Sequence, residues 1–119
     1  MKKIYYLSTC STCNRIIKEL NLGNSFVFQD IKTEKITAEQ LSEMAKMSGS
    51  YESLFSRRAL KFKALGLKDK TLSETDYKNL ILEEYTFLKR PVIIIDNNIF
   101  VGNSKKTVEA AALALWHQT

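Results

Sequence analysis

A chain of 119 residues can bury one hydrophobic core but not two, so a single domain over 1–119 is predicted. Its 45% hydrophobic and 26% charged content is typical of a folded globular protein and excludes a disordered one. The net charge of +5 comes from lysines scattered along the chain, which indicates a solvated surface and no direct nucleic-acid binding.

Membrane and secretory signals are missing from the sequence. The longest wholly apolar run, Val92–Ile95, is far below the ~20 residues that span a bilayer. Ile4–Leu7, near the basic start of the chain, is shorter than the ~7–15 apolar residues of a secretory signal. We therefore expect a cytoplasmic protein with no membrane partner.

The first thirty residues predict a βαβ unit. Ile4–Leu7 is a short apolar and aromatic run, typical of a buried strand. Apolar residues then recur at the spacing of one helix face, at Cys13, Ile16, Ile17 and Leu20. Phe26–Phe28 is β-prone and predicts a second strand, parallel to the first because a helix connects them.

The middle of the chain, about 37–88, is predicted to be a helical insert. Thr37 and Gln40 form a capping box that begins its first helix. Apolar spacing predicts a second helical stretch over 54–65, either straight or kinked, and a third that reaches Leu88.

The last thirty residues predict a β-hairpin and a helix. Val92–Ile95 is a buried strand, Asp96–Asn98 a tight turn, and Ile99–Val101 an antiparallel return strand. Ser104 is placed to cap the final helix. The chain is thus an α/β protein of order β-α-β, helical insert, β-β-α, with a mixed four-stranded sheet.

Two cysteines, Cys10 and Cys13, stand where the first strand turns into the first helix. Unpaired backbone N–H groups at a helix start favour a thiolate and can lower a cysteine pKa to roughly 3.5–7.5. Ser11 and Thr12 are small and keep the approach open. Cys13 lies within reach of a disulfide with Cys10, although two unrelated buried cysteines are the alternative. With His117 the only histidine, the chain offers too few ligands for a structural zinc site.

Three motifs, together with the order of elements, resemble the ArsC/Spx family of glutaredoxin-coupled arsenate reductases and Spx-type transcription regulators. They are Cys10–Cys13, Leu54–Arg58 and Leu88–Ile93. The resemblance covers essentially the whole chain and implies a thioredoxin-like fold. The motifs are specific for the family but not for the substrate of a member.

The resemblance also implies roles for single residues. Cys10 matches the nucleophile, Arg90 an oxyanion-binding arginine, and Pro91 a cis proline that closes the site. Either Arg57 or Arg58 matches a second anion-binding arginine; the spacing favours Arg58, and the alternative puts both on a solvated helix face. The predicted catalytic residues are Cys10, Cys13, Arg90 and Arg58, and the predicted substrate-binding residues are Ser11, Thr12, Arg57 and Pro91.

The chain departs from the arsenate reductases at two points. They carry a third arginine shortly after the hairpin, where this chain has Val101–Asn103, and they usually lack a cysteine at the position of Cys13. One missing charge-assisted contact to an oxyanion is worth roughly 1.5–3 kcal/mol, which weakens the case for arsenate as substrate.

Three functions fit these features. The first is a thiol oxidoreductase that attacks a small oxyanion or a disulfide, holds no cofactor, and takes electrons through Cys13, glutathione or glutaredoxin. The second is an Spx-like regulator that binds RNA polymerase and uses Cys10 and Cys13 as a redox switch. The third is a family member with weak catalysis. A monomer is expected.

Overall fold

The computed structural model describes residues 1–116, and the chain divides into two compact units. Unit 1 comprises Met1–Lys35 and the chain from Arg90 onward, and unit 2 comprises Ile36–Lys89. His117 lies outside the described residues. No helix within residues 1–116 is long and apolar enough to cross a bilayer.

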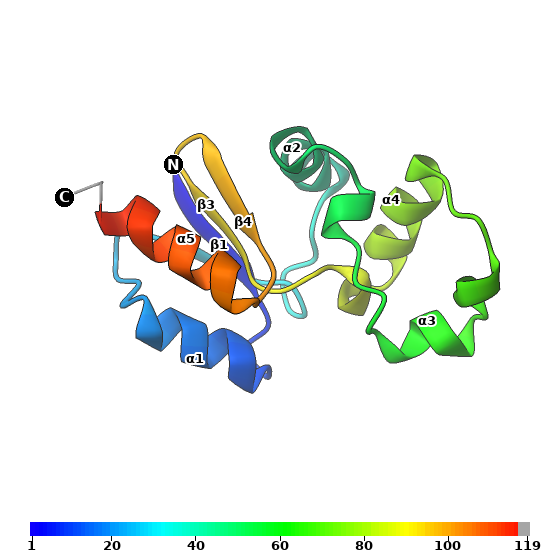
Figure 1. Cartoon of the computed structure of the whole chain (residues 1–119), viewed down its shortest axis with the longest axis horizontal. Helices are drawn as coiled ribbons and strands as arrows, with labels where there is room; N and C mark the ends of the chain where they lie inside the picture. Colours follow the sequence, from blue (N-terminus) through cyan, green and yellow to red (C-terminus); the bar gives the residue numbers. More distant parts are fainter. Residues whose placement is uncertain (117–119) are drawn as a thin grey trace. The chain divides into compact units, whose positions relative to one another are not determined.

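Unit 1 is built on a mixed four-stranded sheet in the order β2-β1-β3-β4 (Figure 1). The strands are β1 (Lys2–Tyr6), β2 (Val27–Asp30), β3 (Val92–Ile95) and β4 (Asn98–Val101). β2 runs parallel to β1, whereas β3 is antiparallel to both β1 and β4. The predicted strand directions, the hairpin and the mixed sheet are therefore confirmed.

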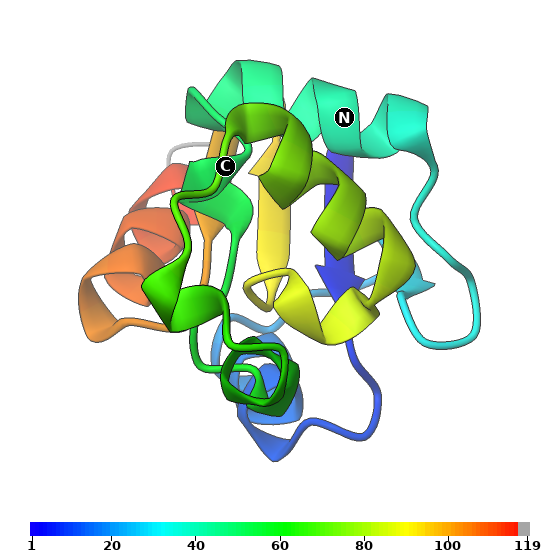
Figure 2. The same cartoon turned by 90° about the vertical axis from the view of Figure 1, so that its right-hand side faces the viewer.

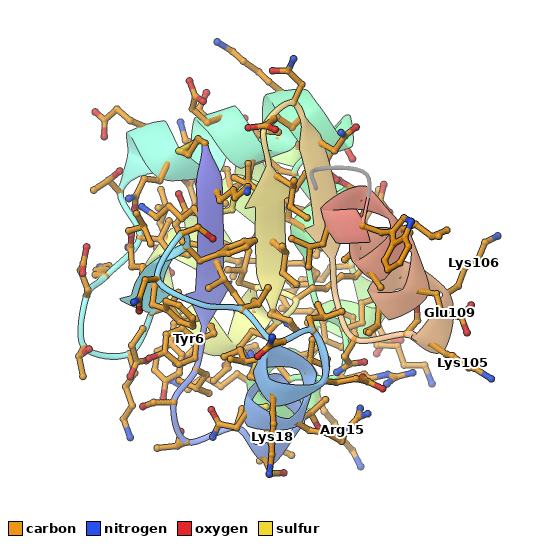
Figure 3. All side chains as sticks on the ribbon, turned by 90° about the vertical axis from the view of Figure 1, so that its left-hand side faces the viewer. Tyr6, Arg15, Lys18, Lys105, Lys106 and Glu109 are labelled. Atoms are coloured by element: carbon orange, nitrogen blue, oxygen red, sulfur yellow. The ribbon has the colours of Figure 1, made fainter. Side chains whose placement is uncertain are left out.

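Helices α1 (Ser11–Glu19) and α5 (Lys105–Trp116) lie on the same face of this sheet (Figures 1 and 3). The buried residues of the core between them are Ile4, Ile16, Phe26, Ile93, Ile95 and Ala111. Burying one large aliphatic side chain of this kind contributes about 1.5–3 kcal/mol. The predicted apolar face of α1 is thus the one that holds the helix, and Cys13 with it, against the sheet.

The outer surfaces of α1 and α5 are basic. Arg15 and Lys18 on α1, and Lys105 and Lys106 on α5, project away from the sheet (Figure 3). Arg15 makes an exposed ion pair with Glu19, at 3.8 Å. Exposed pairs of this kind contribute little to stability, and this is the solvated surface that the scattered charges predict.

Unit 2 holds three α-helices, α2 (Ala38–Ser48), α3 (Leu60–Ala64) and α4 (Glu74–Glu83), which run in different directions (Figure 2). Two short 3₁₀ turns, η1 (Glu52–Leu54) and η2 (Leu67–Asp69), lie between these helices, and a third, η3 (Tyr85–Phe87), follows α4. Thr37 and Gln40 form the predicted capping box, with both reciprocal hydrogen bonds present.

The predicted helical stretch over 54–65 is correct only in its second half. Phe55 is extended (φ −87°, ψ 129°) and pairs with Leu88, and helical structure resumes only at α3. The physical reason is tertiary packing: the Phe55 ring is fully buried, with ring centroids 4.9 Å from those of both Phe87 and Tyr77. The helix predicted to reach Leu88 ends at Glu83 for the same reason, since Phe87 packs in this aromatic group.

Candidate functional site

Four segments of unit 1 meet at one edge of its sheet. The parallel strands β1 and β2 end at the same edge, and β3, which is antiparallel to β1, begins there. The end of β4 also lies there, because the Gly102 N–H donates to the Pro91 carbonyl oxygen at 2.9 Å. The edge therefore gathers the turn of residues 7–10, Asp30, Arg90 with Pro91, and Gly102.

Cys10 occupies the N-cap of α1. Its N–H donates to the Leu7 carbonyl oxygen at 2.9 Å, which closes a tight turn between β1 and the helix. The Cys10 backbone is still extended (φ −92°, ψ 112°), and the first helical turn contains no acidic residue. The thiol thus meets the positive end of the helix without a competing carboxylate from that turn.

The pKa of Cys10 is lowered from its ordinary value. Partial burial of the sulfur acts against ionisation, but hydrogen bonds from the Cys13 N–H, the Cys13 thiol and the Thr12 N–H outweigh it, together with the charge of Arg90. Every one of these groups favours the charged form. Cys10 is half-buried, so that the thiolate remains in contact with solvent.

Cys13 has the opposite character. Its side chain is fully buried, and burial raises its pKa to about 11, with a further upward contribution from the Cys10 sulfur. Backbone hydrogen bonding to Leu7 and the charge of Arg90 offset this only in part. The pair therefore consists of one thiol that ionises readily and one that stays protonated and donates a hydrogen bond to it.

Arg90 and Pro91 lead into β3, and the peptide bond between them is cis. The Arg90 charge favours the thiolate form of both cysteines. Of the predicted substrate-binding residues, Ser11 begins α1 with an exposed side chain and Thr12 offers its N–H to the Cys10 sulfur. Unit 1 thus brings together Cys10, Cys13, Thr12 and Arg90.

Sequence reasoning missed a polar contact beside this site. The Ser8 hydroxyl donates to an Asp30 carboxylate oxygen at 2.5 Å, and the Asn14 side-chain amide donates to the Ser8 carbonyl oxygen at 2.9 Å. The contact could have been found from the sequence, because an acid that follows the second strand of a βαβ unit lies beside the end of the first. Asp30 was overlooked because the strand was predicted to end at Phe28.

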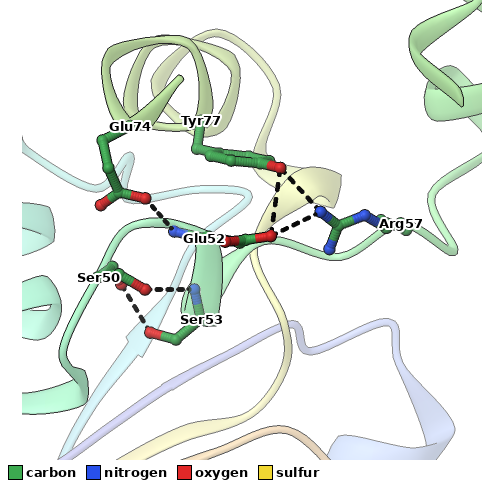
Figure 4. Close-up of polar contacts among 6 residues, drawn as sticks. All are labelled: Ser50, Glu52, Ser53, Arg57, Glu74 and Tyr77. Atoms are coloured by element: carbon green, nitrogen blue, oxygen red, sulfur yellow. Dashed lines mark hydrogen bonds and ion pairs between the residues drawn. The ribbon is translucent and has the colours of Figure 1, made fainter. Parts of the chain in front are cut away.

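Arg57 and Arg58 both lie in unit 2, on the turn that follows Phe55 and not on a helix face. Arg57 is engaged within that unit (Figure 4): its Nη2 donates to Glu52 Oε2 at 3.0 Å and to the Tyr77 hydroxyl at 2.8 Å. Its guanidinium also lies over the Tyr77 ring, 5.6 Å from the centroid. Arg57 is thus held in a structural network.

The segment before Arg57 is anchored as well (Figure 4). The Glu74 carboxylate accepts the N–H groups of Tyr51 and Glu52, at 2.7 and 3.1 Å, and Figure 4 draws the second of these contacts. Arg58 differs from Arg57: its guanidinium is exposed and makes no ion pair or hydrogen bond with any residue of the 1–116 span. Of the two arginines, Arg58 is the one with its charge available.

Within residues 1–116, no three His, Cys, Asp or Glu side chains are grouped so that they could hold a metal ion. The chemistry available at the edge of the sheet is that of a thiolate, a second thiol, an arginine and backbone N–H groups.

A family model described as the ArsC family matches residues 5–111. Comparison with curated proteins gave no match. The solved structure of the protein named YFFB superposes with a TM-score of 0.79 at 24% identity, over 97% of this chain and 99% of that one.

Two further solved structures are similar. An arsenate reductase (ArsC) related protein from Brucella melitensis has a TM-score of 0.69 at 24% identity, over 92% of each chain. The arsenate reductase from Vibrio cholerae has a TM-score of 0.72 at 18% identity, over 92% of this chain and 95% of that one. At these identities the superpositions show that the thioredoxin-like fold is shared.

Proposed function

This chain belongs to the ArsC family, and we propose that it is a thiol-dependent oxidoreductase in which Cys10 is the nucleophile and an oxyanion such as arsenate is the substrate. The observation that carries the proposal is the difference between the two cysteines. Cys10, at the start of α1, has a lowered pKa, while Cys13 beside it has its pKa raised to about 11. A thiolate next to a protonated thiol is the arrangement that attack followed by resolution requires.

The reaction has two chemical steps. The Cys10 thiolate attacks arsenic and forms an S–As bond, and an arsenate oxygen leaves as water after protonation. A second thiol then attacks the Cys10 sulfur, so that an S–S bond forms and the S–As bond breaks. The electron pair of that bond stays on arsenic, which is reduced from As(V) to As(III). Two external thiols, from glutathione or a glutaredoxin, reduce the disulfide and are themselves oxidised.

Arg90 is assigned to the oxyanion because its positive charge already acts on the Cys10 sulfur, the atom that the oxyanion must approach. A planar guanidinium suits a tetrahedral oxyanion because it can donate two parallel hydrogen bonds. Arg58 is assigned as the second anion-binding arginine. Its availability supports this choice over Arg57, which Glu52 and Tyr77 already engage.

Cys13 is assigned as the resolving thiol. It already donates a hydrogen bond to the Cys10 sulfur, so the two sulfur atoms are neighbours. Burial is the main cause of its raised pKa, and the smaller contribution of the Cys10 thiolate is lost once Cys10 has bonded to arsenic, which favours attack by Cys13 at that stage. Resolution by glutathione is the other route, and the Cys13→Ser variant separates the two.

A redox-switch regulator that binds RNA polymerase is the second candidate. The same neighbouring cysteines favour it, since a disulfide between Cys10 and Cys13 would be a reversible signal that needs no substrate. In a regulator, the pairing of Arg57 with Glu52 would fix a binding surface, and Arg90 would have no oxyanion to hold.

The test is a coupled assay that follows NADPH oxidation with arsenate, glutathione, glutaredoxin and glutathione reductase, run in parallel with a glutathione disulfide substrate. Turnover that depends on Cys10 and Arg90 is the expected result. Background rates for the native chain with both substrates, alongside a reversible Cys10–Cys13 disulfide, would instead favour the regulator.

A further inference from the structure

We propose that Ser8, Asp30 and Asn14 are positioning residues that hold the turn before α1, and with it the Cys10 sulfur, in place against the backbone N–H donors at the start of the helix. The inference rests on the proposed role of Cys10 as a nucleophile. Its test reads the ionisation of Cys10 directly, so it can succeed or fail whatever the substrate proves to be.

The turn of residues 7–10 sets where Cys10 enters the helix. Cys10 N donates to the Leu7 carbonyl oxygen at 2.9 Å, and Asn14 N donates to the Cys10 carbonyl oxygen at 3.1 Å. Among the groups that stabilise the Cys10 thiolate are the backbone N–H groups of Thr12 and Cys13, two and three residues further along the chain. Because such contacts depend steeply on distance and angle, a small rotation of this turn moves the Cys10 sulfur away from its donors.

Two hydrogen bonds attach this turn to its neighbours, one to the sheet and one to α1. On one side, the Ser8 hydroxyl donates to Asp30 at the end of β2, the strand that pairs with β1. On the other side, the Asn14 amide donates to the Ser8 carbonyl oxygen from the second turn of α1. Ser8 is therefore attached through its side chain to the sheet and through its backbone to the helix.

Asp30 is itself held in place by further hydrogen bonds. Its other carboxylate oxygen accepts the Lys32 N–H at 3.1 Å, and its carbonyl oxygen accepts the Glu34 N–H at 2.8 Å. The Ser8 hydroxyl is the largest cause of the lowered pKa of Asp30, so this hydrogen bond favours the charged carboxylate. A fixed, charged acceptor is suited to hold one hydroxyl in place.

These contacts are exposed, and exposed polar pairs contribute little to folding stability. The negative charge of the carboxylate cannot itself favour a thiolate, because a like charge disfavours the charged form of a neighbouring acid. Geometry is the remaining way in which Asp30 favours the thiolate, and geometry and charge can be separated by mutation.

The experiment measures the rate of iodoacetamide alkylation at Cys10 from about pH 5 to about pH 9, with the label mapped by mass spectrometry. The variants are Ser8→Ala, Asp30→Ala, Asp30→Asn and the double variant Ser8→Ala/Asp30→Ala. Thr9→Ala is the matched control, because the Thr9 hydroxyl lies in the same turn and makes no hydrogen bond with the part of the chain that is described, residues 1–116. Thermal denaturation of each variant is recorded alongside.

We expect Ser8→Ala and Asp30→Ala each to raise the Cys10 pKa and slow its alkylation near neutral pH by about two- to fivefold. The double variant should be no slower than the slower single variant, because both mutations break one contact. Asp30→Asn keeps an acceptor oxygen and should not raise the Cys10 pKa, and Thr9→Ala should match the native chain.

Three results would overturn the proposal. One is a lowered Cys10 pKa in Asp30→Ala and Asp30→Asn alike, which is a pure charge effect. Another is additive slowing in the double variant. The last is a reduced melting temperature with an unchanged Cys10 pKa in Ser8→Ala, which is a purely structural role. An inactive native chain that still shows the expected pKa pattern would contradict the proposed function and leave the positioning role intact.

Discussion

The two units of the chain differ in net charge and in the groups that their arginines contact. Unit 1 has nine basic and five acidic residues, whereas unit 2 has nine basic and eight acidic ones, so most of the net charge of +5 belongs to unit 1. In unit 1, Arg90 acts on the sulfur atoms of Cys10 and Cys13. In unit 2, Arg57 forms an ion pair with Glu52 and donates a hydrogen bond to the Tyr77 hydroxyl.

The difference separates two uses of arginine that look alike in the sequence. A guanidinium paired with a carboxylate and hydrogen-bonded to a phenol has less charge to offer a ligand, although an exposed pair of this kind contributes little to stability. A guanidinium beside a thiolate favours the reactive form of that group. We therefore expect substitutions at the site in unit 1 to lower turnover, and substitutions in the aromatic group of unit 2 to lower the free energy of unfolding.

The largest effect is expected for the nucleophile itself. Cys10→Ser should lower turnover of the oxyanion substrate by about a thousandfold or more, because a serine hydroxyl does not ionise near neutral pH. Cys13→Ser should lower turnover less if glutathione can resolve the adduct in its place. The coupled assay measures both variants, and equal defects would mean that Cys13 is as essential as Cys10.

A change in the aromatic group of unit 2 is expected to act on stability. Phe55 is fully buried against Phe87 and Tyr77, so Phe55→Ala should cost about 3–5 kcal/mol of unfolding free energy. Denaturant unfolding, followed by circular dichroism, measures it. Leu60→Ala is the matched control, because Leu60 is 90% exposed and its truncation should have almost no effect. A loss below about 1 kcal/mol in Phe55→Ala would show that the aromatic group does not hold the unit.

The comparison between Arg90 and Arg57 can be tested with one substitution. Arg90→Lys should lower kcat/KM for the oxyanion by about ten- to a hundredfold, since a point charge cannot replace a two-pronged contact. Arg57→Lys should change it by less than about threefold, because Glu52 and Tyr77 engage Arg57. A larger loss in Arg57→Lys than in Arg90→Lys would reverse the assignment of the two arginines.

The smallest effect is expected from restoring the third arginine. A Cβ on Gly102 would meet open space, but the φ of +93° at this position strains any other residue, so Asn103 is the better position. Asn103→Arg should raise kcat/KM for arsenate by about three- to tenfold through one added charge-assisted hydrogen bond. Asn103→Gln is the control for side-chain size. Equal rates in both variants would mean that no oxyanion binds beside this loop.

The fold of unit 1 could be predicted because local signals and packing agree there. Val92–Ile95 is wholly apolar, and a strand buried on both faces is what the structure contains. The hairpin turn and the Ser104 cap depend on residue chemistry over two or three positions, and both were predicted. The turn is one residue shorter than predicted, because Asn98 already begins β4 and Asp96 takes the positive φ of 54°.

The segment around Phe55 could not be predicted for the opposite reason. Its apolar spacing is typical of a helix, but the Phe55 ring packs against Tyr77 and Phe87, which are more than twenty residues away in the sequence. Tertiary packing of this kind overrides local propensity and leaves no trace in the spacing. The contact between Ser8 and Asp30 was not predicted because the second strand was predicted to end at Phe28, two residues short of the acid that lies beside the end of β1.

The start of α1 makes two neighbouring cysteines chemically unequal, and alkylation across pH tests this inequality most directly. A lowered pKa keeps the Cys10 thiolate populated to lower pH, whereas Cys13 should ionise only as pH approaches about 11. With iodoacetamide and mass mapping, we predict that Cys10 is labelled almost alone at neutral pH and that Cys13 follows only in strongly alkaline solution. Equal labelling at neutral pH, or labelling of Cys13 first, would contradict the assignment of Cys10 as the nucleophile.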